Sequence, residues 1–327
     1  MDTGTHVVMG LALGAMATLD PAITPGTITG QAVLVGTLIG SQLPDSDTVL
    51  KLVNNAKYIR NHRGITHSLP AVLLWPILAT IGLHFVFPEA NILHVWIWTF
   101  IAVCFHVFVD IFNAYGTQAL RPLSNKWVAI GVINTFDPFI FSMHVVGLIL
   151  WRFGFHPGYT FIGIYIVLLG YYVLRFYMKH RVIKACHAIV PHVQKVIVSP
   201  TLRFTNWHLV IITDKKQYVA KAAGEKITIV DSFEILKIPD IPVVQKAMKD
   251  KNLSAFLSFS PVYRWEFEIL DDHYEVRFTD LRYLSKGYYP FVAVVKLDLQ
   301  ENIISSYTGW IFSEAKLMKK LKFVTES

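Results

Sequence analysis

Long apolar runs separated by short polar segments dominate the first half of the chain. The runs 93–112 and 159–178 each contain 20 residues, and the run 69–87 contains 19. An α-helix needs about 20 predominantly apolar residues to cross the hydrocarbon core of a bilayer. These three runs therefore predict membrane-spanning helices.

Three shorter apolar runs, 5–19, 30–43 and 139–153, complete the pattern of this half. The first two are rich in Gly and Ala and are separated by a turn that contains proline and glycine. Small residues allow helix backbones to approach closely in lipid. We expect a tightly packed pair of short helices here, or a re-entrant pair. Either arrangement returns the chain to its starting side, which gives six crossings in all.

The second half shows the β-branched and aromatic content and the partial alternation that are typical of strands. Strands are expected at 195–199, 208–213, 263–270, 274–280 and 291–297. Helices are expected at 242–251 and 313–321. The predicted fold is a polytopic α-helical membrane domain, residues 1–178, followed by a smaller cytosolic β-rich α+β domain, residues 179–327.

The distribution of charge supports this division. Residues 1–178 contain 8 Lys/Arg and 7 Asp/Glu, whereas residues 179–327 contain 22 and 16. A mildly basic domain beside a membrane suits the anionic headgroups of a lipid bilayer. Direct nucleic-acid binding is not expected, because the tail has neither a dense Lys/Arg run nor an aromatic platform motif.

The orientation follows from the placement of the basic residues. Lys and Arg occur in the loops 44–68 and 113–138 and after residue 178, whereas the opposite loops contain none. Basic loops remain on the cytosolic side of a membrane. We therefore predict a multi-pass protein of the cell membrane with both termini in the cytosol.

His and Asp side chains gather at the cytosolic level of these helices. His106 and Asp110 are four residues apart, so they share one face of a helix, and Asn113 follows on nearly the same face. An imidazole and a carboxylate placed in this way can bind one divalent metal. The alternative is a polar helix end at the interface, although ionisable groups within spanning segments are usually functional.

Two loops add further polar groups at the same level. Asp45 and Asp47 directly follow an apolar run, a spacing found both in metal-binding loops and in helix caps. The segment 61–68 contains His62, Arg63 and His67 around a glycine, together with two hydroxyl side chains. A plain surface loop rarely concentrates so many functional groups, which favours a functional site.

The predicted metal site combines four of these residues with His6, which opens the first apolar run, because the topology brings four separated segments to one face. The five residues are His6, Asp47, His67, His106 and Asp110. Mixed imidazole and carboxylate ligands favour Zn, and Mn or Fe next, over Ca. Enough ligands are present for two ions, which would suit displacement at a phosphoryl group.

The order of these motifs resembles a known family. Thr5-His6, the segments 43–47, 62–68 and 106–110, and then Asn113 and Asp137-Pro138 resemble the bacterial membrane-bound metal-dependent hydrolases, also described as LexA-binding, inner-membrane-associated hydrolases. That family is similar to the zinc-dependent phospholipases C, which implies the same five ligands and zinc. The later His-x-x-x-Glu pair of the phospholipases has no counterpart in residues 1–178.

The resulting hypothesis is a metal-dependent hydrolase of the bacterial inner membrane. It acts on a phosphoester that resembles a lipid headgroup, at the cytosolic face. Asp45 would act as general base or orient a ligand, and Arg63 would neutralise a substrate anion. Asp137 would hold a ligand imidazole in the correct tautomer, and His62 and Asn113 would support the ligands.

Two other functions remain open from the sequence. The tail could bind a cytosolic protein, so that the chain is a membrane-tethered regulator in which the metal only fixes the helices. The LexA association of the similar family points in this direction. A transporter ranks last, because transport sites favour charges near the middle of the bilayer, whereas these charges cluster at one face.

Overall fold

The computed structural model describes residues 1–52, 54–285 and 287–322. Its contacts divide the chain into two compact units. The first unit consists of Met1–Asp47, His62–Arg181 and Ser199–Thr205. The second consists of Thr48–Asn61, Val182–Val198 and Asn206–Ser327.

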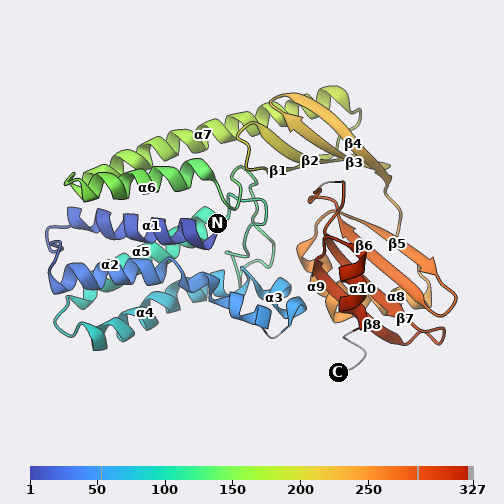
Figure 1. Cartoon of the computed structure of the whole chain (residues 1–327), viewed down its shortest axis with the longest axis horizontal. Coiled ribbons are helices and arrows are strands. Elements are labelled where there is room, and N and C mark those ends of the chain that lie inside the picture. Colours follow the sequence, from blue (N-terminus) through green and yellow to red (C-terminus); the bar gives the residue numbers. More distant parts are fainter. Residues whose placement is uncertain (53, 286, 323–327) are drawn as a thin grey trace. The chain divides into compact units, whose positions relative to one another are not determined.

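Apolar helices build the first unit, and they lie side by side in Figure 1. They are α1 (Thr3–Met16), α2 (Ile28–Gly40), α4 (Leu69–Val86), α5 (Ile92–Asp110), α6 (Pro138–Arg152) and α7 (Pro157–Ile189). Three of them, α4, α5 and α7, are long and apolar enough to cross a membrane, as the sequence predicts. Helices α1, α2 and α6 are apolar but shorter.

Glycines bring α1 and α2 into close contact. A Cβ atom on Gly14 would lie 2.6 Å from Leu34 Cδ1 and 2.8 Å from Thr37 Oγ1. A Cβ atom on Gly40, at the end of α2, would lie 2.8 Å from the carbonyl oxygen of Thr99 in α5. The small residues therefore set the spacing of three helices, which confirms the predicted tight packing of the first pair.

The second unit contains two four-stranded sheets (Figure 1). The first has the order β1-β2-β3-β4 and the second the order β5-β6-β7-β8. Their strands are β1 (Lys195–Pro200), β2 (Asn206–Ile212), β3 (Lys216–Ala223), β4 (Lys226–Glu234), β5 (Tyr263–Ile269), β6 (Tyr274–Asp280), β7 (Phe291–Leu297) and β8 (Ile303–Trp310).

All five expected strands are present, and β3, β4 and β8 are additional. The helix expected at 242–251 ends earlier, as α8 (Pro242–Met248), and α9 (Lys251–Phe259) follows it directly. Helix α10 (Glu314–Lys322) matches the expected final helix. A helical membrane region followed by a sheet-rich domain is thus confirmed.

A short segment between two membrane helices belongs to the second unit. Helix α3 (Asn55–Asn61) buries Ala56 and Ile59 in a core with Phe256 of α9 and residues of β6 and β7. The side-chain amide of Asn55 donates to the carbonyl of Thr308 in β8. The expected division after residue 178 falls within α7, close to the change of unit at Arg181. The sequence did not predict that Thr48–Asn61 belongs to the second unit.

Candidate metal centre

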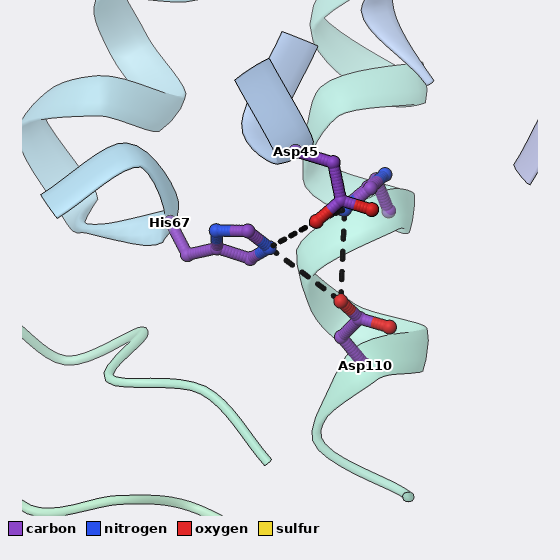
Figure 2. A group of neighbouring side chains, drawn as sticks. Asp45, His67 and Asp110 are labelled. Carbon is purple, nitrogen blue, oxygen red and sulfur yellow. Dashed lines mark ion pairs between the residues drawn. The ribbon is translucent and has the colours of Figure 1, made fainter. Parts of the chain in front are cut away.

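Two imidazoles and two carboxylates converge in the first unit, and Figure 2 labels three of these residues, Asp45, His67 and Asp110. Nε2 of His67 lies 3.6 Å from Oδ1 of Asp45 and 3.5 Å from Oδ2 of Asp110. Nε2 of His106 lies 3.8 Å and 3.6 Å from the same two oxygens. One ligand atom from each residue lies within 4.8 Å of the other three. We call these four residues the His/Asp cluster.

Three elements supply the His/Asp cluster. Asp45 lies in the 3-10 helix η2 (Leu43–Leu52), and His67 ends the 3-10 helix η3 (Ile65–His67). His106 and Asp110 occupy the last turns of α5, on the shared face that their spacing predicts. The short 3-10 elements bring their side chains up to the end of a long rigid helix.

The hydrogen bonds of the two imidazoles fix which nitrogen faces the cluster. Nδ1 of His106 donates to the carbonyl of Ser41, at 2.7 Å. Thr66 Oγ1 donates to Asp47 at 2.7 Å, so it accepts from Nδ1 of His67, 3.1 Å away. Each ring therefore carries its proton on Nδ1 and turns the lone pair of Nε2 inward, as metal-ligating histidines do.

The cluster consequently holds four acceptors and no donor of its own. The side chains of His67, His106 and Asp110 are almost completely buried. The two Nε2 atoms, Oδ1 of Asp45 and Oδ2 of Asp110 have no hydrogen-bond partner among the described residues. Buried acceptors in this state require compensation. Two imidazole nitrogens and two carboxylate oxygens fit a divalent transition metal, so the cluster could hold one ion.

The pKa shifts around the cluster agree with this assignment. Burial lowers the pKa of His67 well below its usual value, and the electrostatic effects of the neighbouring His106 and Arg63 act in the same direction. Burial raises the pKa of Asp45, but the same two neighbours outweigh it and leave that pKa below its usual value. A neutral imidazole and an ionised carboxylate are the forms that bind metals.

Basic groups surround Asp110 on its other side. His6 of α1 stacks on the ring of His106, with centroids 3.6 Å apart, and its Nε2 lies 3.4 Å from Oδ1 of Asp110. The guanidinium of Arg63 lies 3.3 Å from Oδ2 of Asp110 and donates to the carbonyl of Met1. The α-amino group of Met1 also contacts Asp110. His6 is thus brought to the site, and Arg63 adds a buried positive charge beside it.

Asp47 has a different set of contacts from Asp45. Its carboxylate accepts from Nδ1 of His62 at 2.8 Å, from the backbone N–H of Arg63 at 2.9 Å and from Thr66. It therefore shapes the loop that presents His67. The structure places Asp45, rather than Asp47, between the two imidazoles, whereas Asp45, Asp47 and His62 form a second group that could hold an ion.

Asn113 and Asp137 support backbone structure. The side-chain oxygen of Asn113 accepts from the N–H groups of Tyr115 and Gly116, and its amide lies 3.5 Å from Asp110. Asp137 caps the N-terminus of α6 and accepts from the hydroxyl of Tyr171 at 2.8 Å. Within the described part of the chain, Asp137 accepts from two backbone N–H groups of α6 and from Tyr171, and not from a histidine.

Sequence reasoning missed two groups that orient the imidazoles. Thr66 is one of two hydroxyl residues in its loop. Its position directly before His67 is the feature of the sequence that could have indicated its contact with that imidazole. The group from Ser41 is a backbone carbonyl, which leaves no side-chain signal in a sequence.

Residues 1–182 match the family model described as YdjM inner membrane protein. This chain belongs to the YdjM inner membrane protein family. Residues 191–233 and 242–321 of this YdjM-family member match the YfhP middle domain and the YfhP C-terminal alpha/beta plait domain. A curated relative from Bacillus subtilis (strain 168), described as uncharacterized protein YfhP, is 54% identical over 323 residues, which cover 98% of this chain and 99% of the relative. No solved structure matches the chain.

The expectation of a membrane protein is thereby confirmed, and the bilayer is the environment of this YdjM-family chain. The hydrolase activity and the phospholipase C similarity are not part of what these matches establish.

Proposed function

We propose that this YdjM-family protein is a metal-dependent hydrolase of phosphoesters, with zinc as the metal. The observation that carries the proposal is the convergence of four buried acceptors, without a donor of their own, beside the buried guanidinium of Arg63. Structural zinc sites are closed by four ligands, whereas catalytic sites retain an accessible position. Asp45 is the most exposed member of the cluster, with 17% of its side chain accessible, so substrate and water would approach there.

The residues have distinct tasks in this proposal. His67, His106 and Asp110 would hold the ion, which supplies Lewis-acid polarisation of a phosphoryl oxygen and activation of water when it is bound. Asp45 orients the attacking water and accepts its proton, because it is the ionised carboxylate nearest the accessible side. Asp47, with His62 and Thr66, keeps the loop before His67 in position.

Arg63 would act on the substrate. Its guanidinium stays protonated and has no acceptor, so it cannot bind a cation. The planar, multidentate group matches the oxygens of a phosphate, and its buried position excludes competing water. A lipid phosphoester is the favoured substrate, because His106 and Asp110 lie in the last turns of a spanning helix and thus at headgroup depth.

The proposal is tested by measuring metal content and phosphodiester cleavage on the same detergent-purified protein. Wild type should retain about one equivalent of zinc, as a site with three protein ligands and one accessible position does. It should cleave a member of a panel of phospholipids and small phosphodiesters. The double variant His106→Ala with Asp110→Ala should lose both the metal and the activity.

Arg63 variants separate catalysis from metal binding. Arg63→Asn should keep the zinc and lower the rate about 10²–10³-fold, as loss of a preorganised charge donor does. Asn suits this position because Arg63 has a φ of 58°, a conformation that Asn tolerates better than Ala. Arg63→Lys should recover only part of the rate, since lysine makes no bidentate contact. Zinc-loaded wild type that cleaves no member of the panel would contradict the hydrolase and favour the membrane-tethered regulator.

A further inference from the structure

A second site lies in the first unit, apart from the His/Asp cluster. A pocket of about 570 Å³ opens between the start of α6, the middle turns of α7 and residues 201–204 of the connection between β1 and β2. No member of the cluster lines it. Its volume falls within the range of roughly 300–1,000 Å³ that is usual for small-molecule sites.

The lining of this pocket is apolar and accessible. Five large apolar side chains that line it are between 41% and 62% exposed: Phe139, Val167, Leu174, Leu202 and Phe204. Soluble proteins rarely leave so many neighbouring apolar groups in water. On a spanning helix such a surface faces hydrocarbon, so an acyl chain is the natural occupant.

A glycine leaves the pocket open along α7. Gly170 lines the pocket, and a Cβ atom built on it would meet no atom within 4 Å. A larger side chain at this position would project into open space without displacing a neighbour. The space is therefore available to a ligand in the folded protein.

Hydrogen bonds and ring contacts fix another part of the pocket wall. Arg175 is 1% exposed, and it donates from Nε to the carbonyl of Val132 at 2.9 Å and from Nη1 to the carbonyl of Phe204. Its guanidinium also lies 5.5 Å from the centre of the Phe204 ring. The ring of Tyr171, whose hydroxyl binds Asp137, lies 5.9 Å from that of Phe204. These contacts fasten the segment Ser199–Thr205 against α7 and close one side of the pocket.

Basic residues follow the pocket along α7. Arg175 lines the pocket together with Asp137, and α7 continues through Lys179 and Arg181 without an intervening acid. The exposed Arg203 lies between the lining residues Leu202 and Phe204. Such a change from apolar to basic residues marks the level of the headgroups. Basic residues at that level attract anionic lipid.

We propose that this pocket binds one anionic glycerophospholipid of the surrounding bilayer, with an acyl chain over Gly170 and the phosphate beside the basic end of α7. The apolar lining, the open glycine position and the basic residues that follow the pocket together select this occupant. The site does not depend on the proposed hydrolase activity, because it shares no residue with the His/Asp cluster.

The test measures lipid retention by the whole purified protein. Wild type, Gly170→Leu and Gly82→Leu are prepared in mild detergent, incubated with mixed micelles of that detergent and phosphatidylglycerol or phosphatidylcholine, and examined by native mass spectrometry. Gly82 is the matched control, because it lies on the spanning helix α4, its Cβ position is equally open, and it does not line the pocket. Leucine favours helix more than glycine does, so both variants should fold.

Wild type and Gly82→Leu should each retain one phosphatidylglycerol, and Gly170→Leu should lose it. Arg203→Gln should reduce the preference for phosphatidylglycerol over phosphatidylcholine, whereas Arg152→Gln, at the other end of α6, should not. Equal retention by Gly170→Leu and wild type would overturn the proposal. Detergent alone in the wild-type spectrum, or a change of oligomeric state in Gly170→Leu without loss of lipid, would overturn it as well.

Discussion

The hydroxyl of Thr66 joins a carboxylate that lies outside the His/Asp cluster to an imidazole within it. Because it donates to Asp47, it must accept from Nδ1 of His67, and this fixes the tautomer of the ligand nitrogen. Supporting hydrogen bonds of this kind orient metal ligands and raise their basicity. We therefore expect Thr66 to affect metal affinity through His67, without being a ligand itself.

Replacement of Thr66 by valine should weaken metal binding about 10–100-fold, which is typical for loss of a group that orients a ligand. Valine keeps the shape of the side chain and removes only the hydrogen bonds. Competition with a chelator of known zinc affinity measures the effect. Thr66→Ser should bind like wild type because the hydroxyl remains. An unchanged affinity in Thr66→Val would show that the hydrogen bond to His67 does not set the affinity.

Only some side-chain positions of the candidate site could be predicted from the sequence. The spacing of His106 and Asp110 was sufficient to place both on one helix face, and they do lie on one face. The sequence predicted Asp47 as the metal ligand and Asp45 as the base, whereas Asp45 lies between the two imidazoles, because the directions of both side chains depend on the 3-10 geometry of η2. The contacts of Asp137 depend on the start of α6 and on Tyr171, which is distant in sequence.

At the scale of elements, close packing of α1, α2 and α5 holds the cluster in place. Gly10 of α1 faces the end of α2, where a Cβ atom would lie 3.0 Å from both Leu38 Cα and the carbonyl oxygen of Thr37. Ser41, whose carbonyl orients His106, follows α2 directly. The distance between α1 and α2 thus affects the position of the Ser41 carbonyl and, through it, the orientation of the His106 ring.

Gly10→Leu should destabilise the protein by about 1–3 kcal/mol, as overpacking of a well-packed interior does. The backbone of α2 would have to move, and the carbonyl of Ser41 would move with it, so metal affinity should fall too. Thermal unfolding in detergent and zinc titration measure the two effects. Gly82→Leu is the control on an open helix face. Wild-type stability in Gly10→Leu would mean that α1 and α2 pack less closely than described.

The elements that were not predicted from the sequence depend on contacts between segments that are distant along the chain. Strand β3 contains alanines and lysines, which have low strand propensity, and its pairing with β2 and β4 compensates for that. Helix α7 continues to Ile189, beyond the apolar run, because polar residues can extend a helix once it leaves the bilayer. Helix α3 is short, and its burial depends on residues that lie far along the chain. Local patterns do not contain this information.

For the whole molecule, the distribution of basic residues predicts how the chain is inserted. Reporter fusions after Lys126 and after residue 327 should give cytosolic signals, and a fusion after Pro157 should give an external signal. Paired alkaline phosphatase and fluorescent protein fusions measure both outcomes. An external signal after Lys126 would contradict the prediction that the His67 loop and the end of α5 with His106 lie on the same side of the membrane.

The segment Thr48–Asn61 has a consequence for biosynthesis. It is made early, between Asp47 and His62, but Ala56 and Ile59 are buried against residues that the ribosome adds roughly two hundred positions later. A chain released after α7 would expose this apolar face and leave the loop before His67 without its anchor. We therefore expect the metal centre to mature only once the tail has been translated, so that incomplete chains in the membrane remain without a finished site.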